Sequence, residues 1–133
     1  HGRKILMFHG NSLNDVVTQI PDLSYSKLDE RMMGRCMSVL AKGRHLAPVY
    51  GGKTGIYPSV EDPLVIEDVP DVIHMGHIHV AAITSCGGVL LVNSGGWQAR
   101  TSYQERMGLV PTTSTAVVLS LRSLDRFIMR FGA

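Results

Sequence analysis

The chain has 133 residues, of which 44% are apolar and 18% are charged, and this composition is typical of a folded globular protein and excludes a disordered one. Its length allows one core and one domain. The formal net charge is only +2, although nine of the thirteen basic residues are arginine, so net charge by itself does not indicate a nucleic-acid partner.

The cysteines and the hydropathy indicate the compartment. Cys36 and Cys86 lack metal-binding spacing, and free thiols suit a reducing cytoplasm. No apolar run approaches the roughly 20 residues that span a bilayer, and no signal peptide opens the chain, so no membrane contact is expected. The first residue is His1 and not methionine, and a strand follows almost at once, which indicates a fragment whose upstream part is missing.

The first third of the chain predicts one strand and two helices. Residues 4–8 are a continuous apolar run, typical of a strand covered on both faces. The sequence Ser12-Leu13-Asn14-Asp15 fits a capping box, so a short helix is expected over residues 12–20. Apolar residues at helical spacing predict a long amphipathic helix over residues 26–42, with Gly43 as its C-cap.

An irregular segment follows the long helix, over residues 44–63. Within it, Gly52-Lys53-Thr54 invites comparison with a phosphate-binding loop, but that motif needs a glycine where this chain has Ala47, and a strand and a helix around it. Long loops in compact domains are usually functional or disordered, so contact with a phosphate backbone or a partner is one interpretation and a solvated loop is the other. The residues that favour contact are Arg44, His45 and Lys53.

A cluster of histidines carries the strongest functional signal. An apolar strand leads into Gly76-His77-Ile78-His79, and residues two apart in an extended chain point to the same side, so His77 and His79 are expected to share a pocket. Neutral imidazole is the commonest protein ligand for transition metals, whereas two charged imidazoles would repel each other. We therefore predict a metal site here, and we interpret His74 as an ordinary structural histidine.

His9 is a third candidate ligand. It stands between the first strand and the next helix, where α/β folds bind their ligands, although an ordinary surface histidine is the alternative. A site that hydrolyses phosphate esters uses two cations about 3.5–4 Å apart together with carboxylates. Apart from Asp71, which precedes the strand, no acidic residue is adjacent to these histidines in sequence. The carboxylates of such a site are therefore expected either upstream of this chain or not at all.

The remainder predicts two hairpins and a polar connection. Glycines separate the first two strands, and a polar turn separates the last two. The connection over residues 98–111 has room for a helical turn, and Trp97, the only tryptophan, is expected in the core and not as the roof of a pocket. The predicted strands are residues 80–84, 89–92, 115–121 and 127–131.

Four segments of the chain can be compared with known families. They are His9-Gly10 after a strand, Arg44 to Gly52, Pro70 to His79, and Gly88 to Ala99. Together they resemble the small subunit of the archaeal family D DNA polymerase, which is part of the calcineurin-like metallophosphoesterase superfamily. Gly-His-x-His is shared by that superfamily, whereas the His-Leu-Ala-Pro and Asn-Ser-Gly-x-Trp-Gln segments are more specific to the subunit.

The resemblance implies a fold and an activity. The fold is α/β (α+β), the C-terminal half of a calcineurin-like phosphoesterase β-sandwich flanked by helices, so that residues 1–133 are the C-terminal portion of one metallophosphoesterase domain. The activity is 3′–5′ exonucleolytic proofreading with two divalent metal ions, Mn²⁺ first and Mg²⁺, Zn²⁺ or Fe²⁺ as alternatives. By resemblance, His9 and His77 bind one metal ion and His79 binds the other, and these three are the catalytic residues.

The resemblance also implies partners and leaves alternatives. The partners are the large catalytic subunit of the polymerase, in a heterodimer, and the 3′ end of DNA, in the cytoplasm near the nucleoid. The family's Asp-x-His, bridging Asp and Gly-Asn-His-Asp motifs are absent, so the isolated fragment is expected to be inactive. A non-catalytic scaffold subunit and a generic calcineurin-like phosphoesterase are the alternatives. The residues expected to contact DNA are Arg44, His45, Lys53, Asn93 and Trp97.

Overall fold

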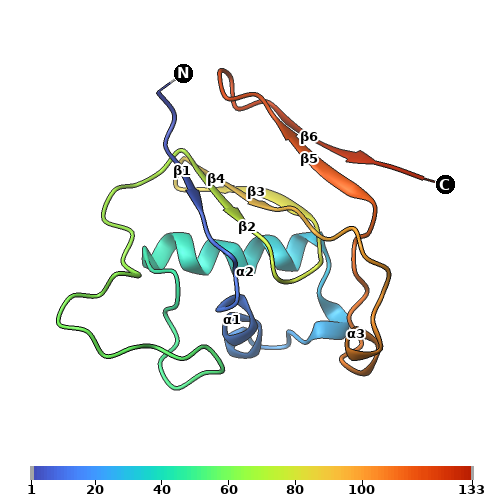
Figure 1. Ribbon diagram of the computed structural model, residues 1–133, viewed down its shortest axis with the longest axis horizontal. Helices are drawn as coiled ribbons and strands as arrows, with labels where there is room; N and C mark the ends of the chain where they lie inside the picture. The colour runs from blue at the N-terminus through green and yellow to red at the C-terminus, as the bar shows by residue number, and fades with distance from the viewer. Residues whose placement is uncertain (1, 133) are drawn as a thin grey trace.

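The computed structural model describes residues 2–132, so that His1, which was used above to judge the start of the chain, lies outside them. A mixed four-stranded sheet has helices on one face and a two-stranded sheet on the other (Figure 1). The helices are α1 (Leu13–Gln19), α2 (Glu30–Gly43) and α3 (Ser102–Arg106). The strands are β1 (Ile5–Met7), β2 (Val72–Met75), β3 (Ala82–Cys86), β4 (Val89–Asn93), β5 (Thr115–Leu119) and β6 (Arg126–Arg130). The predicted α+β class is confirmed.

The topology of the larger sheet determines where the histidine loops lie. The strand order is β1-β2-β4-β3, with β1 and β4 both parallel to β2 and with β3 antiparallel to β4. Because parallel neighbours end at the same edge of a sheet, the segments after β1 and β2 emerge side by side. The two predicted hairpins are β3–β4 and β5–β6, which pair in antiparallel fashion.

The core lies on both faces of this sheet. On the helix side, Ile73 and Leu91 of the sheet pack with Met33 and Met37 of α2, and all four side chains are buried. On the other side, buried valines and leucines of β2 and β4 pack against β5 and the β5–β6 turn. The two faces explain why β4 is a continuous apolar run, since each of its residues is buried.

The first strand is less covered than predicted. Ile5 is 43% exposed and Met7 is 75% exposed, so the prediction of a strand buried on both faces is wrong. Within the described residues, β1 pairs with β2 alone and forms an edge of the sheet. Its outer side chains line a groove of about 380 Å³ between β1 and β5, which the β5–β6 hairpin does not close.

Two caps differ from their predictions. Gly43 is the last residue of α2, and the left-handed cap conformation belongs to Arg44, with φ of 48°. Ser12 has helical backbone angles and does not cap α1, because its hydroxyl donates instead to the carbonyl of Leu46. At Ser12 a long-range contact to Leu46 replaces the local cap, whereas at Arg44 the cap is local, because Arg44 N donates to the carbonyl of Ala41.

The long helix begins at Glu30 and not at residue 26, because Asp29 is its N-cap. The backbone N–H of Met32 donates to Asp29 Oδ1 at 2.7 Å. Replacing Asp29 by alanine is expected to lower the free energy of unfolding by about 1 kcal/mol, because this N–H then has no acceptor. Urea denaturation measures the loss. Glu61→Ala, which removes an exposed acidic side chain from a loop, is the matched control. An equal loss of unfolding free energy in both variants would mean that the lost negative charge, and not the lost cap, causes the effect.

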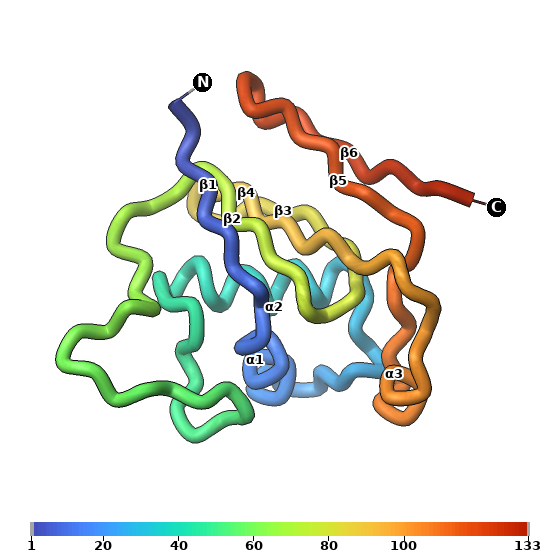
Figure 2. Tube along the Cα trace, in the orientation of Figure 1, coloured from blue at the N-terminus to red at the C-terminus, as the bar shows by residue number. Residues whose placement is uncertain are grey.

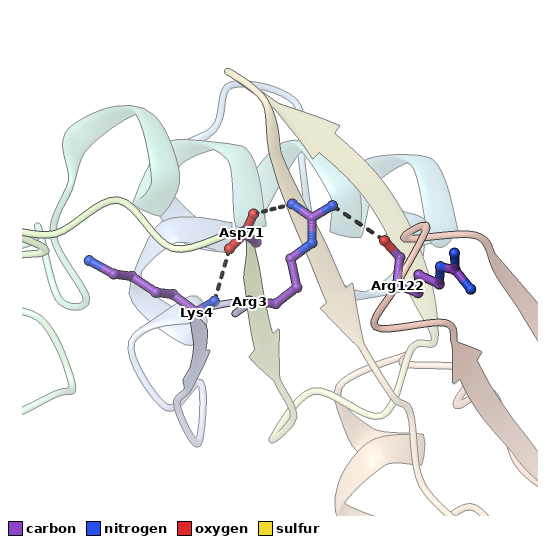
Figure 3. A network of polar contacts seen from close by, with 4 residues as sticks. All are labelled: Arg3, Lys4, Asp71 and Arg122. Carbon is purple, nitrogen blue, oxygen red and sulfur yellow. Dashed lines mark hydrogen bonds and ion pairs between the residues drawn. The ribbon is translucent and has the colours of Figure 1, made fainter. Parts of the chain in front are cut away.

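At the N-terminal ends of β1 and β2, hydrogen bonds and an ion pair join the two strands (Figure 3). Asp71 accepts hydrogen bonds from Arg3 Nη1 at 2.7 Å and from the backbone N–H of Lys4 at 2.8 Å. The hydrogen bond from the Lys4 backbone, followed by the one from Arg3, holds the pKa of Asp71 below its usual value. Arg3 also reaches the carbonyl of Arg122 in the β5–β6 turn, so this network joins both sheets.

The connection between α2 and β2 makes a long excursion to one side of the sheet (Figure 2). Between these two elements the described chain forms only an isolated bridge, His45 with Val65. The prediction of an irregular segment is therefore confirmed. None of the helices within residues 2–132 is long and apolar enough to cross a membrane.

Candidate functional site

Two histidines meet beyond the ends of β1 and β2. His9 Nε2 and His77 Nδ1 are 3.0 Å apart, and the two rings stand edge to face with centroids 4.9 Å apart. Backbone hydrogen bonds hold the two loops together, because Phe8 N donates to the carbonyl of His74 at 2.9 Å and Gly76 N donates to that of His9 at 3.1 Å. The structure thus brings together two of the three predicted ligands.

This close approach requires a glycine at position 10. Gly10 has φ of 95°, which L side chains rarely adopt, and a Cβ there would lie 2.8 Å from the carbonyl oxygen of Gly76. The His9-Gly10 pair therefore has a structural role as well as a candidate ligand, since the glycine lets the two loops touch.

A tight turn orients His77. Its φ is 65°, and Ile78 N donates to the carbonyl of Gly76 at 2.8 Å, which closes a three-residue turn centred on His77. His77 and His79 do line one pocket, as predicted, but the predicted reason, an extended strand, is wrong, because β2 has already ended at Met75. A non-glycine residue in this conformation is strained, and the surroundings must hold it.

Asn93, at the end of β4, stabilises that turn through its side-chain amide. Its side chain is fully buried, and Nδ2 donates to the carbonyls of Ile78 at 2.6 Å and Val80 at 2.7 Å. The prediction that Asn93 contacts DNA is wrong for this structure, because no part of it reaches the surface. Its role is to anchor the backbone on either side of His79.

His79 is placed by a short helix that the sequence only hinted at. Gln104 Nε2 lies 3.0 Å from His79 Nδ1, and Gln104 Oε1 accepts from Thr101 N at 2.9 Å in the capping box of α3. Gly96 also lies against this ring, because a Cβ there would be 3.0 Å from His79 Nδ1. The Thr-x-x-Gln pattern was visible in the sequence as a capping box, but its link to His79 was not.

His77 and His79 line one cleft. Its volume is about 450 Å³, and its wall also carries two phenols, Tyr25 and Tyr103. Tyr25 is linked to His77 through Asn14, because Tyr25 Oη donates to Asn14 Oδ1 at 2.6 Å and Asn14 Nδ2 lies 2.6 Å from His77 Nε2. The sequence interpretation missed Tyr25, Asn14 and Gln104 as parts of the site, since no local pattern marks them.

The electrostatics of the cleft favour uncharged groups. Partial burial lowers the pKa of His77, and the neighbouring imidazoles of His9 and His79 lower it further, because a second positive charge would be repelled. Burial raises the pKa of Tyr25 to about 12, with smaller contributions from Tyr103 and Asp15. At neutral pH His77 is therefore the neutral imidazole that can bind a metal ion, and Tyr25 keeps its proton.

The donor set suits one part of a metal centre. Two imidazole nitrogens converge, His9 Nε2 and His77 Nδ1, and imidazole is a good ligand for first-row transition metals. No group of three or more His, Cys, Asp or Glu side chains within residues 2–132 is arranged to hold a metal ion. Asp71 does not complete the site, because it lies at the other end of β2 and pairs with Arg3.

The basic residues predicted to contact DNA have different environments. Arg44 donates to the carbonyls of Ile66 and Glu67, so its guanidinium holds the excursion in place. His45 pairs with Asp62 at 2.8 Å, and its Nδ1 accepts from the backbone N–H of Ala47. Lys53 is exposed. Internal contacts thus occupy Arg44 and His45, whereas Lys53 is available to a partner.

Trp97 lies on the surface, and its predicted place in the core is wrong. It is 64% exposed, and its ring lies 5.3 Å from that of Phe131, centroid to centroid. Trp97 instead lines the groove of about 380 Å³ between β1 and β5, so the alternative, a place at a pocket, describes it better. Because the Trp97 ring is exposed on the loop after β4, its contact with DNA remains a prediction.

The glycine-rich Gly51-to-Gly55 loop is held by a carboxylate of this chain. Asp15 Oδ1 accepts from Lys53 N at 2.6 Å, and Asp15 Oδ2 accepts from Thr54 N at 3.0 Å. Burial opposes the charge of Asp15, but hydrogen bonds from the Thr54 side chain and from both backbone N–H groups outweigh it, so the pKa lies below its usual 3.8. The rejection of a phosphate loop agrees with this arrangement.

Replacing Asp15 by alanine is expected to free this loop, which trypsin reports by cutting after Lys53. Loss of two hydrogen bonds to a charged acceptor corresponds to about 3 kcal/mol, or a roughly 100-fold larger open population. Because the pKa of Asp15 is lowered, the stabilisation is complete above pH 3.8 and is lost as pH falls through the folded-state value. Asp68→Ala, in an exposed pair with Lys4, should leave the cleavage rate unchanged. Equal cleavage rates in the two variants would contradict the role of Asp15 in holding this loop.

Known proteins similar to this chain share one description. No protein-family model matches the chain. It is 46% identical over 117 residues to the DNA polymerase II small subunit of Archaeoglobus fulgidus, covering 88% of this chain and 23% of that protein. It is 46% identical over 121 residues to that of Pyrococcus furiosus, covering 91% and 19%, and 39% identical over 133 residues to that of Halobacterium salinarum, covering 98% and 25%. The chain thus spans about a fifth to a quarter of the curated relatives that it matches. The resemblance found in the sequence is confirmed, and over the part that it spans the chain belongs to the family of archaeal DNA polymerase II small subunits.

Proposed function

We propose that the protein containing this chain is the small subunit of a DNA polymerase and that it hydrolyses DNA phosphodiester bonds from the 3′ end. The names of the relatives support the polymerase role. The observation that carries the hydrolytic role is the convergence of His9 Nε2 and His77 Nδ1 at 3.0 Å, with His79 on the same cleft as His77. Two imidazoles that converge beyond the ends of two parallel strands, the pKa of His77 being lowered, are suited to a cation.

In this proposal His9 and His77 hold one divalent cation and His79 holds the other. When bound, two cations neutralise the charge of a phosphate group and lower the pKa of water. Imidazole suits a transition metal, so Mn²⁺ is the first choice and Fe²⁺, Zn²⁺ or Mg²⁺ are the alternatives. The carboxylates that balance the charge come from parts of the protein outside residues 2–132.

The other residues of the cleft position these ligands. Gln104 and Gly96 confine the ring of His79, and Asn93 holds the backbone around it. Trp97 and Lys53, both exposed, are the proposed contacts to DNA, the first by stacking on bases and the second at phosphates. In the full assembly the large catalytic subunit of the polymerase is the proposed partner.

The test uses the full-length protein and a 5′-labelled single-stranded oligonucleotide. With Mn²⁺ we expect a ladder of products shortened from the 3′ end, and a chelator should stop the reaction. Products shortened from the 5′ end, or none under any of the four metals, would refute the nuclease. Co-purification with the large subunit tests the heterodimer separately.

A non-catalytic scaffold is the second candidate, and one observation favours it. Among residues 2–132, those that line the cleft include His77 and His79 but no acidic side chain. Polymerase assembly without DNA hydrolysis would support this alternative.

A further inference from the structure

A continuous chain of hydrogen bonds leads from Tyr25 to the two facing histidines. Tyr25 Oη donates to Asn14 Oδ1 at 2.6 Å, Asn14 Nδ2 lies 2.6 Å from His77 Nε2, and His77 Nδ1 lies 3.0 Å from His9 Nε2. Asn14 belongs to α1 and Tyr25 to the short 3-10 turn before α2, so two separate elements support the His77 ring.

The chemistry of these groups gives the chain one direction. An amide NH₂ only donates, so Nε2 of His77 must accept, and the neutral ring carries its proton on Nδ1. That proton points at His9 Nε2, which accepts it. All three hydrogen bonds therefore run from Tyr25 towards His9.

A cation held by His9 and His77 requires the opposite direction. The nitrogens that face each other are His9 Nε2 and His77 Nδ1, so Nδ1 is the ligand atom of His77 and must carry no proton. The neutral ring then carries its proton on Nε2, where it needs an acceptor.

Asn14 can supply that acceptor because of its other partner. Half a turn of the amide places Oδ1 against His77 Nε2–H and places the NH₂ group against Tyr25 Oη. A phenol hydroxyl accepts as well as it donates, so Tyr25 satisfies the amide in either orientation. Tyr25 is half-buried and lines the cleft, so its own proton can then point to water there.

We infer that Asn14 and Tyr25 are positioning residues that form a reversible relay, which holds the His77 ring and reverses its hydrogen bonds when a cation binds Nδ1. The ring keeps one proton in both states. This inference depends on the proposed function in one respect, namely that a cation binds His9 and His77.

The direct test is histidine NMR on the full-length protein labelled with ¹⁵N-histidine, with the spectrum of His77→Ala assigning the His77 signals. Without metal we expect the proton of His77 on Nδ1, and with Zn²⁺ alone we expect it on Nε2. A metal-free ring protonated on Nε2 would overturn the relay. If the expected tautomers are observed but the protein does not hydrolyse DNA, the relay is supported and the nuclease is refuted. Failure of the relay can therefore be told apart from failure of the proposed function.

Zn²⁺ affinity, measured by calorimetry, gives a second readout. Asn14→Leu removes both the donor and the acceptor, and the affinity should fall by about 10–100-fold. Asn14→Asp supplies a permanent acceptor for Nε2–H and should keep or raise the affinity. Gln19→Leu, at the exposed end of α1, should change nothing. Equal affinities in all variants, or equal losses in Asn14→Leu and Asn14→Asp, would overturn the relay.

Discussion

Replacing His79 by alanine in the full-length protein is expected to abolish release of nucleotides from the 3′ end. In the proposed centre His79 is the ligand from this chain on the second cation. Loss of an outer partner of a metal ligand lowers affinity or activity by about 10–100-fold, so loss of the ligand itself should exceed about 100-fold. The initial rate of oligonucleotide shortening with saturating Mn²⁺ measures the effect.

His74→Gln is the matched control for this experiment. His74 is also a histidine of this segment, but it lies on β2 and lines the groove between β1 and β5, away from the cleft. Its replacement should leave the rate unchanged. An unchanged rate in His79→Ala as well would remove His79 from the catalytic centre.

Replacing Asn93 by alanine is expected to be strongly destabilising. The substitution leaves the carbonyl of Val80 without its donor and the carbonyl of Ile78 with only the backbone N–H of Val80, in a region where both residues are nearly fully buried. An unsatisfied buried group costs about 1–3 kcal/mol, so the free energy of unfolding should fall by about 1–3 kcal/mol. The turn that strains His77 also loses its anchor, so metal affinity should fall with stability.

The urea midpoint and the Mn²⁺ affinity together measure this effect. Ser85→Ala, on the exposed side of β3, should change neither quantity. Asn93→Asp should be at least as damaging as alanine, because it removes the NH₂ donor and places a charge where Oδ1 is buried without a partner among residues 2–132. A stable Asn93→Ala variant with normal metal affinity would refute the anchoring role.

Local patterns determined most of the elements. Apolar runs and turns predicted the six strands β1 to β6, and helical spacing predicted α2. Helix α1 was predicted from a capping box at Ser12 that the structure does not form. The placement of His9 after β1 and His77 after β2 also followed from sequence, and the structure brings both to the edge of the sheet where parallel strands end. The family resemblance rested on the same motifs and proved right.

Contacts between distant residues decided the rest. Asn93 was predicted on the surface and is buried, because two carbonyls of the histidine loop need its NH₂ group. Arg44 and His45 were predicted to reach outward and instead hold their own loop, because backbone carbonyls and Asp62 lie within reach.

The sequence alone determined which residues are apolar, where the chain turns, and that histidines follow two of the strands, whereas the parallel pairing of those strands came from the structure. Only the tertiary structure decided that a turn at His77, and not a strand, aims its ring, and that Asn14, Tyr25 and Gln104 stand behind the imidazoles. The physical reason is that periodicity reports burial along the chain, whereas the partner of each buried polar atom depends on which distant segment packs beside it.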